Sequence, residues 1–413
     1  MVRVILLIID SLGIGAMEDV PINRVQDIGA NTVKNIMKSS NNLSISNLCK
    51  LGLVNSLGEE IGKFKYSEDA TYGIANLAYK GADSYLGHME IFRYDLSKVK
   101  MNPISESIEE IAYALNDLGY KVDIKYKHNS NNKNGIYSRK VTEIDNRNKS
   151  EPCNSKKYII VNDCVFIGDN IEAEPGTVYS VIGYNKKISF EEIKNIAYEV
   201  RKIVKIPRIV GVSSNLSMKE LQNYIECDGT YIGINSERCN LYNRDYKVEH
   251  MPYKISDTGS ICWDLKKNNI DTTLIGKVAD IIPEEIFRKV NLLRNEEIFK
   301  ALKDSINNMN SKFIAVNFQE CDLSGHLNSV DSYVEKLNEI DGYIGWIINN
   351  IGYNDVLIVT ADHGNDPTIG HRYHTREKVP ILIYNLRKNG EFIGEFLSLE
   401  AVGKYITQKL FTK

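Results

Sequence analysis

The sequence contains no long apolar run. Its clearest apolar segment, Val4–Ile9, spans six residues and stops at Asp10. A membrane-spanning helix requires about 20 apolar residues, and a secretory signal carries a cleavage site behind its apolar core. The sequence therefore predicts a cytoplasmic protein without a membrane segment.

Cysteine is scarce, and its spacing follows no pattern. A disulfide framework uses an even number of cysteines, and a structural zinc knuckle uses closely spaced pairs. The chain has seven cysteines and no C-x-x-C pair: Cys49, Cys153, Cys164, Cys227, Cys239, Cys262 and Cys321. This spacing argues against both kinds of site, and we expect reduced thiols that are buried or half-buried.

An excess of charge of one sign is also missing. The 413 residues carry a formal net charge of −3, with 43% apolar and 25% charged residues. This balance is typical of a globular protein, and it gives no reason to expect nucleic acid or an anionic membrane as a partner. No internal repeat is evident. A chain of this length usually folds as two domains.

Several short segments are apolar at consecutive positions, which is typical of parallel strands buried on both faces. They are Val4–Ile9, Phe313–Phe318 and Val356–Thr360, and Thr272–Lys277 reads as a strand that ends on a lysine. Val330–Ile351 carries apolar residues at helical spacing and is followed by Gly352. These segments predict an α/β core with a mostly parallel sheet.

The middle of the chain has a different pattern of predicted helices and strands. Ser105–Leu118 has a helical apolar stripe, and Tyr120–Tyr126 reads as a strand. Ser189-Phe-Glu-Glu192 is a capping box that opens a helix ending at Ile203. This stretch contributes no cluster of acids and histidines, and it predicts a small α+β unit.

The predicted organisation is therefore a core interrupted by an insertion. Residues 1–98 and 255–413 would form the α/β core, and residues 99–254 would form the inserted α+β domain. Insertion of a domain at a surface loop is physically ordinary.

Acids and imidazoles gather just beyond the predicted core strands. In open parallel sheets, sites are built beyond the carboxyl ends of the strands. Three aspartates and three histidines suit two divalent cations such as manganese, zinc or iron better than calcium, which takes oxygen ligands. A serine or threonine hydroxyl beside such ions could serve as a nucleophile. The candidates are Asp10, Asp322, His326, Asp362, His363 and His374.

Each candidate also has a simpler interpretation. A single aspartate at a strand end is commonly a cap or turn residue. Asp362 and His363 could form a hydrogen-bonded pair in a loop, and His326 alone could be structural. The polar, glycine-punctuated segment Gly81–Glu90 is typical of a surface loop. A metal site is favoured because these aspartates and histidines occur together just beyond the predicted strands.

Three motifs carry a family resemblance: Asp10-Ser-Leu-Gly-Ile-Gly, Gly81-x-Asp-Ser-x-x-Gly-His-x-Glu90, and Asp362-His-Gly-Asn-Asp-Pro with His374-Thr-Arg-Glu-Lys-Val-Pro. Together they resemble the phosphopentomutases, a family of the alkaline phosphatase superfamily related to the cofactor-independent phosphoglycerate mutases. The resemblance implies an alkaline-phosphatase-like core with an inserted cap domain.

The resemblance also implies roles for single residues. Asp322, His326 and His374 would bind one manganese ion. The second ion would be bound by Asp10, Asp362 and His363. Ser84 matches the phosphorylated nucleophile and would face the second ion. Phosphopentomutases usually place a threonine at that position, whereas phosphoglycerate mutases use serine.

Two cations match phosphate-binding positions of the family. Lys277 matches a lysine at a strand end, and Arg244 falls near an arginine contributed by the cap. Both would supply positive charge to a phosphate group, although an ordinary solvated cation is the alternative for each. The spacing from Asp322 to His326 is that of the phosphoglycerate mutases, and no counterpart is found for the family's acidic ribose contact.

The resulting hypothesis is a metal-dependent phosphomutase that moves phosphate between C1 and C5 of ribose or deoxyribose through phosphoserine at Ser84. Two divalent ions, most simply Mn²⁺, and a sugar bisphosphate primer are implied by the resemblance. The expected partner is a small phosphosugar. A phosphatase, or a mutase for a different phosphosugar, is the alternative enzyme, and a non-catalytic metal or phosphosugar-binding protein is the alternative from another class.

Overall fold

The computed structural model describes residues 2–128, 136–140, 155–171, 173–229, 231–236, 238–241, 246–308, 311–386 and 390–411. The chain divides into two compact units, one formed by Met1–Leu96 with Ile255–Lys413 and the other by Ser97–Lys254. The sequence prediction placed the corresponding boundaries at residues 98 and 254. Each unit is described by itself below.

The first unit is built on a mixed sheet. Among the described residues its strands follow the order β13 (Arg288–Val290), β12 (Thr272–Ile275), β14 (Phe313–Phe318), β1 (Arg3–Ile9), β15 (Asp355–Thr360), β16 (Val379–Tyr384), β2 (Thr71–Ala75) and β17 (Glu391–Phe396). The five strands from β13 to β15 are parallel, and β16 runs antiparallel to both of its neighbours. The predicted α/β fold with a mostly parallel central sheet is confirmed.

The central strands form where the sequence is continuously apolar. Every residue of β1, β14 and β15 is buried, as expected for parallel strands covered on both faces. Ile9 of β1 pairs with Phe318 of β14, and Ile8 pairs with Thr360 of β15. This register brings the carboxyl ends of the three strands to one edge of the sheet.

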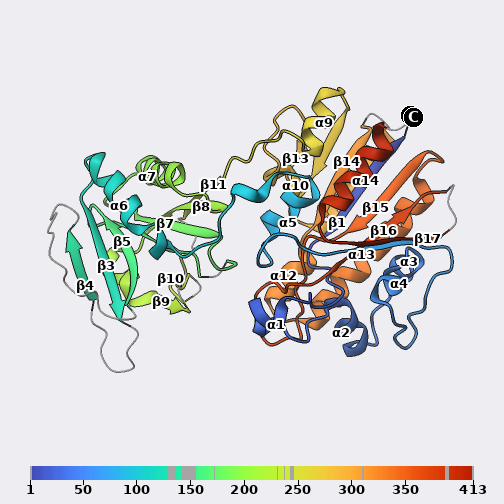
Figure 1. The fold of residues 1–413 in the computed structure, drawn as a ribbon, viewed down its shortest axis with the longest axis horizontal. Helices are drawn as coiled ribbons and strands as arrows, with labels where there is room; N and C mark the ends of the chain where they lie inside the picture. Colours follow the sequence, from blue (N-terminus) through green and yellow to red (C-terminus); the bar gives the residue numbers. More distant parts are fainter. Residues whose placement is uncertain are drawn as a thin grey trace. The chain divides into compact units, whose positions relative to one another are not determined.

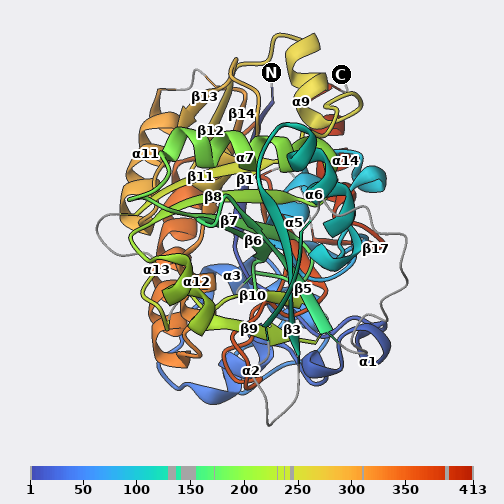
Figure 2. The same ribbon diagram turned by 90° about the vertical axis from the view of Figure 1, so that its left-hand side faces the viewer.

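Helices cover both faces of this sheet (Figures 1 and 2). α11 (Asn295–Asn307) and α13 (Val330–Asn350) lie on one side, and α9 (Ile261–Lys267) and α14 (Glu400–Phe411) on the other. The shorter helices of the unit are α1 (Val20–Asn23), α2 (Thr32–Ser39), α3 (Ser46–Lys50), α4 (Leu53–Leu57), α5 (Ser84–Ile91), α10 (Lys277–Ile281) and α12 (Glu320–His326).

The second unit is a smaller α+β body. Its main sheet has the strand order β11 (Lys247–Pro252), β8 (Arg208–Ser214), β7 (Val178–Tyr184), β6 (Val165–Asp169), β5 (Ser155–Val161), β3 (Val122–His128) and β4 (Ile136–Lys140). The helices α6 (Ile108–Asp117) and α7 (Phe190–Ile203) pack together on one face of it, and the hairpin β9 (Ile225–Asp228) and β10 (Tyr231–Ile234) packs on β5 and β6. The short helix α8 (Met218–Leu221) precedes the hairpin.

Two local predictions need correction. The strand expected over Thr272–Lys277 ends at Ile275, and Lys277 begins helix α10 after Gly276. Gly276 has a φ of 77°, and a Cβ there would lie 2.6 Å from the backbone oxygen of Asn317. A glycine is therefore required for this turn from strand to helix. The surface loop expected over Gly81–Glu90 is the second, because helix α5 begins at Ser84 within this segment and is buried.

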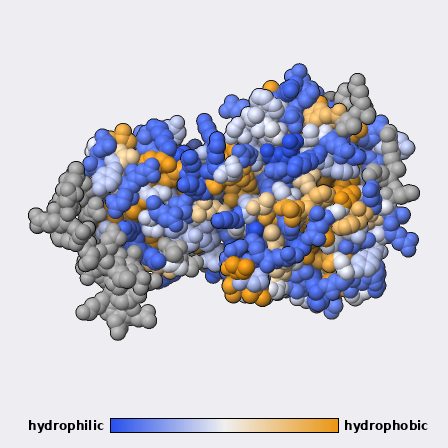
Figure 3. Space-filling model, in the orientation of Figure 1, coloured by the Kyte–Doolittle hydropathy of each residue, from blue (hydrophilic) through white to orange (hydrophobic). Residues whose placement is uncertain are grey.

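On the face shown in Figure 3, apolar residues gather in several small patches between hydrophilic ones. No helix within the described ranges combines the length and the apolar character needed to cross a bilayer. The six cysteines in those ranges are free thiols; Cys153 lies outside them.

In the second unit, a buried carboxylate connects three segments of the chain by hydrogen bonds. Asp169 is 1% exposed, and its two oxygens accept hydrogen bonds of 2.8 Å from the backbone N–H groups of Ile104 and Ile232. It thereby connects β6 to the segment before α6 and to the hairpin strand β10. Burial raises the pKa of Asp169 to about 7, against the opposing effect of the two N–H groups.

We predict that Asp169→Asn destabilises the protein by about 1–3 kcal/mol, because an amide cannot accept both hydrogen bonds and leaves one buried N–H group unpaired. Chemical denaturation of the full-length protein measures this change. The control is Asp163→Asn, which removes an exposed ion pair with Lys121 and should cost less than about 1 kcal/mol. Equal effects of the two substitutions would contradict the assignment.

The same residue predicts a pH dependence. Because the folded-state pKa of Asp169 is raised, the native state keeps a proton that the unfolded state has already lost. The stabilisation from this proton is complete below the unfolded pKa of about 4 and is lost as the pH rises through about 7. The stability difference between wild type and Asp169→Asn should therefore shrink from pH 4 to pH 7. A constant difference would show that Asp169 does not titrate there.

Candidate active site

Three aspartates meet at the carboxyl edge of the central strands. Asp10 directly follows β1, Asp362 lies two residues beyond β15, and Asp322 lies on α12, just after β14. The exposed fractions of Asp10 and Asp362 are 0%, and that of Asp322 is 6%. The structure thus collects acids from distant parts of the sequence in one buried place.

The first cluster consists of Asp322, His326 and His374. Asp322 and His326 are one helical turn apart on α12, with 3.2 Å between His326 Nε2 and Asp322 Oδ2. His374 Nε2 lies 3.5 Å from Asp322 Oδ1 and 3.1 Å from His326 Nε2. The donor atoms of these three side chains all lie within 4.8 Å of one another. The family resemblance implies the same grouping.

The second cluster surrounds Asp362. Oδ2 of Asp362 lies 3.2 Å from His363 Nε2, 3.0 Å from His88 Nδ1, and within a short hydrogen bond of Ser84 Oγ. Asp10, His88 and Asp362 also offer donor atoms within 4.8 Å of one another. The structure places His363 and Ser84 beside Asp362, and it adds His88, to which the sequence interpretation gave no role.

Ser84 is presented by a helix and not by the surface loop expected over Gly81–Glu90. α5 begins at Ser84, and the Asp83 carboxylate caps it by accepting a 2.9 Å hydrogen bond from the N–H of Leu86. All eight residues of α5 are buried. A Cβ on Gly87 would lie 2.4 Å from the backbone oxygen of Asp362, so this glycine permits the close approach of the helix to the strand end.

Lys277 contacts both the nucleophile candidate and a metal-ligand candidate. Its Nζ lies 2.6 Å from Ser84 Oγ and 2.8 Å from Asp10 Oδ2. Burial lowers the pKa of Lys277, but the charges of Asp10 and Asp362 raise it by more, so the ammonium group stays charged. The other cation named from the sequence, Arg244, lies outside the described residues.

Burial and like charges perturb the acids themselves. Burial, together with the charge of Asp362, raises the pKa of Asp10 to about 6. Burial also raises the pKa of Asp362, but the imidazoles of His363 and His88 hold it well below its usual value. Burial and the neighbouring His363 lower the pKa of His374 to about 4, which keeps its ring neutral and its Nε2 lone pair available.

The histidine tautomers fit a cation site. Nδ1 of His326, His363 and His374 lies 2.5, 2.9 and 2.7 Å from the backbone oxygens of Arg372, Gly364 and Ala82. A carbonyl oxygen can only accept, so each Nδ1 carries a hydrogen, and Nε2, which faces the clusters, is the nitrogen left to bind a cation once its own proton is lost. Metal-binding histidines are oriented in this way.

Unpaired buried atoms point to the same conclusion. Asp10 Oδ1 and His363 Nε2 are buried and form no hydrogen bond within the part of the chain that the structure describes. His326 Nε2 and His374 Nε2 lie 3.1 Å apart, and both face the Asp322 carboxylate. A divalent cation at each cluster would satisfy these groups, and the mixed nitrogen and oxygen donors suit manganese, zinc or iron.

One arginine, to which the sequence interpretation gave no role, holds the backbone segment that precedes Ser84. Arg376, in the His374-Thr-Arg-Glu motif, is 5% exposed. Its guanidinium donates 2.7 Å hydrogen bonds to the carbonyl oxygens of Tyr79 and Gly81, and Nε lies 2.9 Å from the Asp19 carboxylate. It thereby fixes the segment that leads to Ser84 and that supplies the Ala82 carbonyl to His374.

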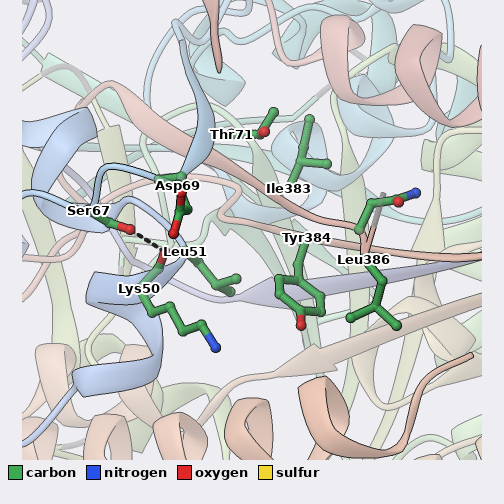
Figure 4. Close-up of a pocket in the computed structure, with 10 residues that line it drawn as sticks. Lys50, Leu51, Ser67, Asp69, Thr71, Ile383, Tyr384 and Leu386 are labelled. Carbon is green, nitrogen blue, oxygen red and sulfur yellow. Dashed lines mark hydrogen bonds between the residues drawn. The ribbon is translucent and has the colours of Figure 1, made fainter. Parts of the chain in front are cut away.

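A separate pocket lies at the opposite edge of the sheet (Figure 4). It has a volume of about 380 Å³, and it lies beside the end of β16 and the start of β2. Its polar lining residues are Lys50, Ser67, Asp69, Thr71, Tyr384 and Asn385. None of the ten residues that line it is a histidine, so the cation chemistry belongs to the two clusters.

The fold and the site define a metal-dependent enzyme, and sequence comparison agrees. Residues 2–413 match the metalloenzyme superfamily, to which the chain therefore belongs. A phosphopentomutase of Clostridium kluyveri is 28% identical over 100% of this chain and 96% of its own length. One from Symbiobacterium thermophilum is 26% identical over 99% of this chain and 94% of its own length. The resemblance to phosphopentomutases read from the motifs is confirmed.

A solved structure shares a distant likeness. The alkaline phosphatase from the Antarctic bacterium TAB5 aligns with 98% of this chain and 97% of its own, at 14% identity and a TM-score of 0.32. The assignment to the superfamily does not depend on this alignment.

We predict that divalent cations stabilise the metal-free protein. Manganese at 100 times its dissociation constant should raise the free energy of unfolding by about 2.7 kcal/mol per site, measured by thermal unfolding after chelation and readdition. Asp322→Asn should lose the part of this gain that belongs to the first cluster. A melting temperature that manganese leaves unchanged would contradict both cation sites.

Proposed function

We propose that the chain is a phosphomutase that moves phosphate between C1 and C5 of ribose or deoxyribose through phosphoserine at Ser84. The observation that carries the proposal is the position of Ser84 Oγ, which lies between Lys277 Nζ and the Asp362 carboxylate of the second cluster. Full-length relatives named phosphopentomutases support the substrate class.

The residues divide into two sets of cation ligands. Asp322, His326 and His374 would hold one ion, and Asp10, Asp362, His363 and Ser84 the other. When bound, two such ions supply charge that stabilises both the attacking and the leaving oxygen of phosphoryl transfer. Manganese remains the metal predicted from the family resemblance.

The chain's own groups prepare the transfer. Phospho-Ser84 gives its phosphoryl group to the free hydroxyl of the bound monophosphate: the bond from Oγ to phosphorus breaks, and a bond from phosphorus to the sugar oxygen forms. The hydroxyl proton passes to the leaving Oγ. Lys277 donates to that oxygen as it gains negative charge. The bisphosphate then reorients and returns its other phosphate to Ser84.

The second unit would serve as the cap of this reaction. A phosphoserine exposed to water would hydrolyse, so a mutase must exclude water while the bisphosphate turns. The first phosphorylation of Ser84 would require a sugar bisphosphate primer. We place the reaction in the cytoplasm, with a small phosphosugar as the only partner that the chemistry requires.

We expect Ser84→Ala to abolish the phosphoenzyme and to lower turnover by roughly 10⁴-fold or more, because no oxygen remains to accept the phosphoryl group. Intact-mass spectrometry after incubation with bisphosphate measures the added phosphate. Ser84→Thr is the matched control, since it keeps a hydroxyl and should keep a phosphoenzyme. Mutase activity retained by Ser84→Ala would overturn the assignment.

The substrate is tested with a panel of pentose, hexose and glycerate phosphates, assayed with manganese and a bisphosphate primer. Ribose and deoxyribose phosphates should yield isomer with little free phosphate. Release of phosphate without isomer would identify a phosphatase. Turnover of another sugar alone would identify a different mutase; that outcome is worth testing because the spacing from Asp322 to His326 follows the phosphoglycerate mutases.

A further inference from the structure

His88 differs from the other histidines of the site because both of its ring nitrogens contact protein groups. It is completely buried. Its Nδ1 lies 2.8 Å from the backbone oxygen of Ser84 and 3.0 Å from Asp362 Oδ2. Its Nε2 is hydrogen-bonded to the side-chain amide of Asn317 and lies 3.6 Å from Asp10 Oδ1.

These contacts argue against a role as a metal ligand. The Ser84 carbonyl can only accept, so Nδ1 of His88 carries a hydrogen and has no lone pair to offer. Nε2 is already paired with Asn317, whose amide can present either its oxygen or its nitrogen. His363, by contrast, turns towards the cluster an Nε2 that accepts no hydrogen bond from any described residue.

We propose that His88 is a positioning residue, which sets Ser84 and Asp362 in the geometry required by the second metal site. This inference rests on the proposed function. His88 belongs to α5, Asn317 to β14, and Asp362 to the turn after β15, so a single side chain ties the nucleophile helix to two strand ends. Without it, the Asp362 carboxylate loses a fixed N–H donor and can rotate away from Ser84 and Asp10.

The first cluster provides an internal reference. Within the described ranges, His88 forms no hydrogen bond or ion pair with Asp322, His326 or His374. The backbone oxygens that orient His326 and His374 belong to Arg372 and Ala82. Loss of a group that orients a metal ligand typically weakens metal affinity by about 10–100-fold. We therefore expect His88→Ala to weaken one of two manganese sites by that factor and to leave the other unchanged.

The test is equilibrium dialysis of the metal-free full-length protein against manganese, which gives the number of ions and their affinities without relying on activity. The side-chain nitrogen of His88→Asn can take the place of Nδ1, whereas that of His88→Gln reaches only the place of Nε2. His88→Asn should keep both ions, and His88→Gln should lose affinity at one site, as His88→Ala does. His363→Asn is the ligand control and should lose one ion.

Several outcomes would overturn the inference. Wild-type binding of both ions by His88→Ala would show that His88 positions nothing. Equal weakening in His88→Asn and His88→Ala would show that the imidazole itself is required. If His88→Ala does not fold, judged by its unfolding transition without metal, His88→Gln decides the question, and two wild-type sites in that variant contradict the proposal. A wild-type protein that binds fewer than two ions would instead overturn the proposed function.

Discussion

The rest of the structure depends on three carboxylates that are buried at one edge of the central sheet. Asp10, Asp322 and Asp362 are nearly inaccessible to water, and Lys277 forms an ion pair with Asp10. Burying unbalanced like charges is costly. Bound cations would offset this buried negative charge. The Nε2 atoms of His326, His363 and His374 face the same clusters and could bind such cations.

The parallel sheet makes this concentration possible. Register fixes the ends of β1, β14 and β15 side by side, so residues separated by more than 300 positions in sequence share one edge. α5 then carries Ser84 onto that edge, and Gly87 lets its backbone approach Asp362. Arg376 holds the segment that precedes the helix. Several elements therefore each position one member of the site.

The strands and long helices could be predicted because their burial leaves a simple pattern. β1, β14 and β15 are apolar at consecutive positions, and α13 shows one apolar stripe that ends before Gly352. The metal-ligand candidates stood out because acids and histidines recur at the strand ends. The family resemblance added their grouping and the role of Ser84.

Other structural features could not be predicted, because they leave no recognisable pattern in the sequence. α5 is buried on every side, so it has no polar face and resembles a glycine-punctuated loop. The antiparallel direction of β16 depends on its partners and not on its own residues. The contacts of His88 and Arg376 arise only when distant segments meet. Arg244 lies outside the described residues, so its predicted role as a phosphate ligand stays a prediction.

The most direct test of the central claim, two cation sites that flank Ser84, is a crystal structure of the manganese-loaded protein with anomalous diffraction data. We predict two anomalous peaks. One should lie among Asp322, His326 and His374, and the other among Asp10, Asp362, His363 and the Ser84 hydroxyl. A single peak, or a second peak away from Ser84, would contradict the account.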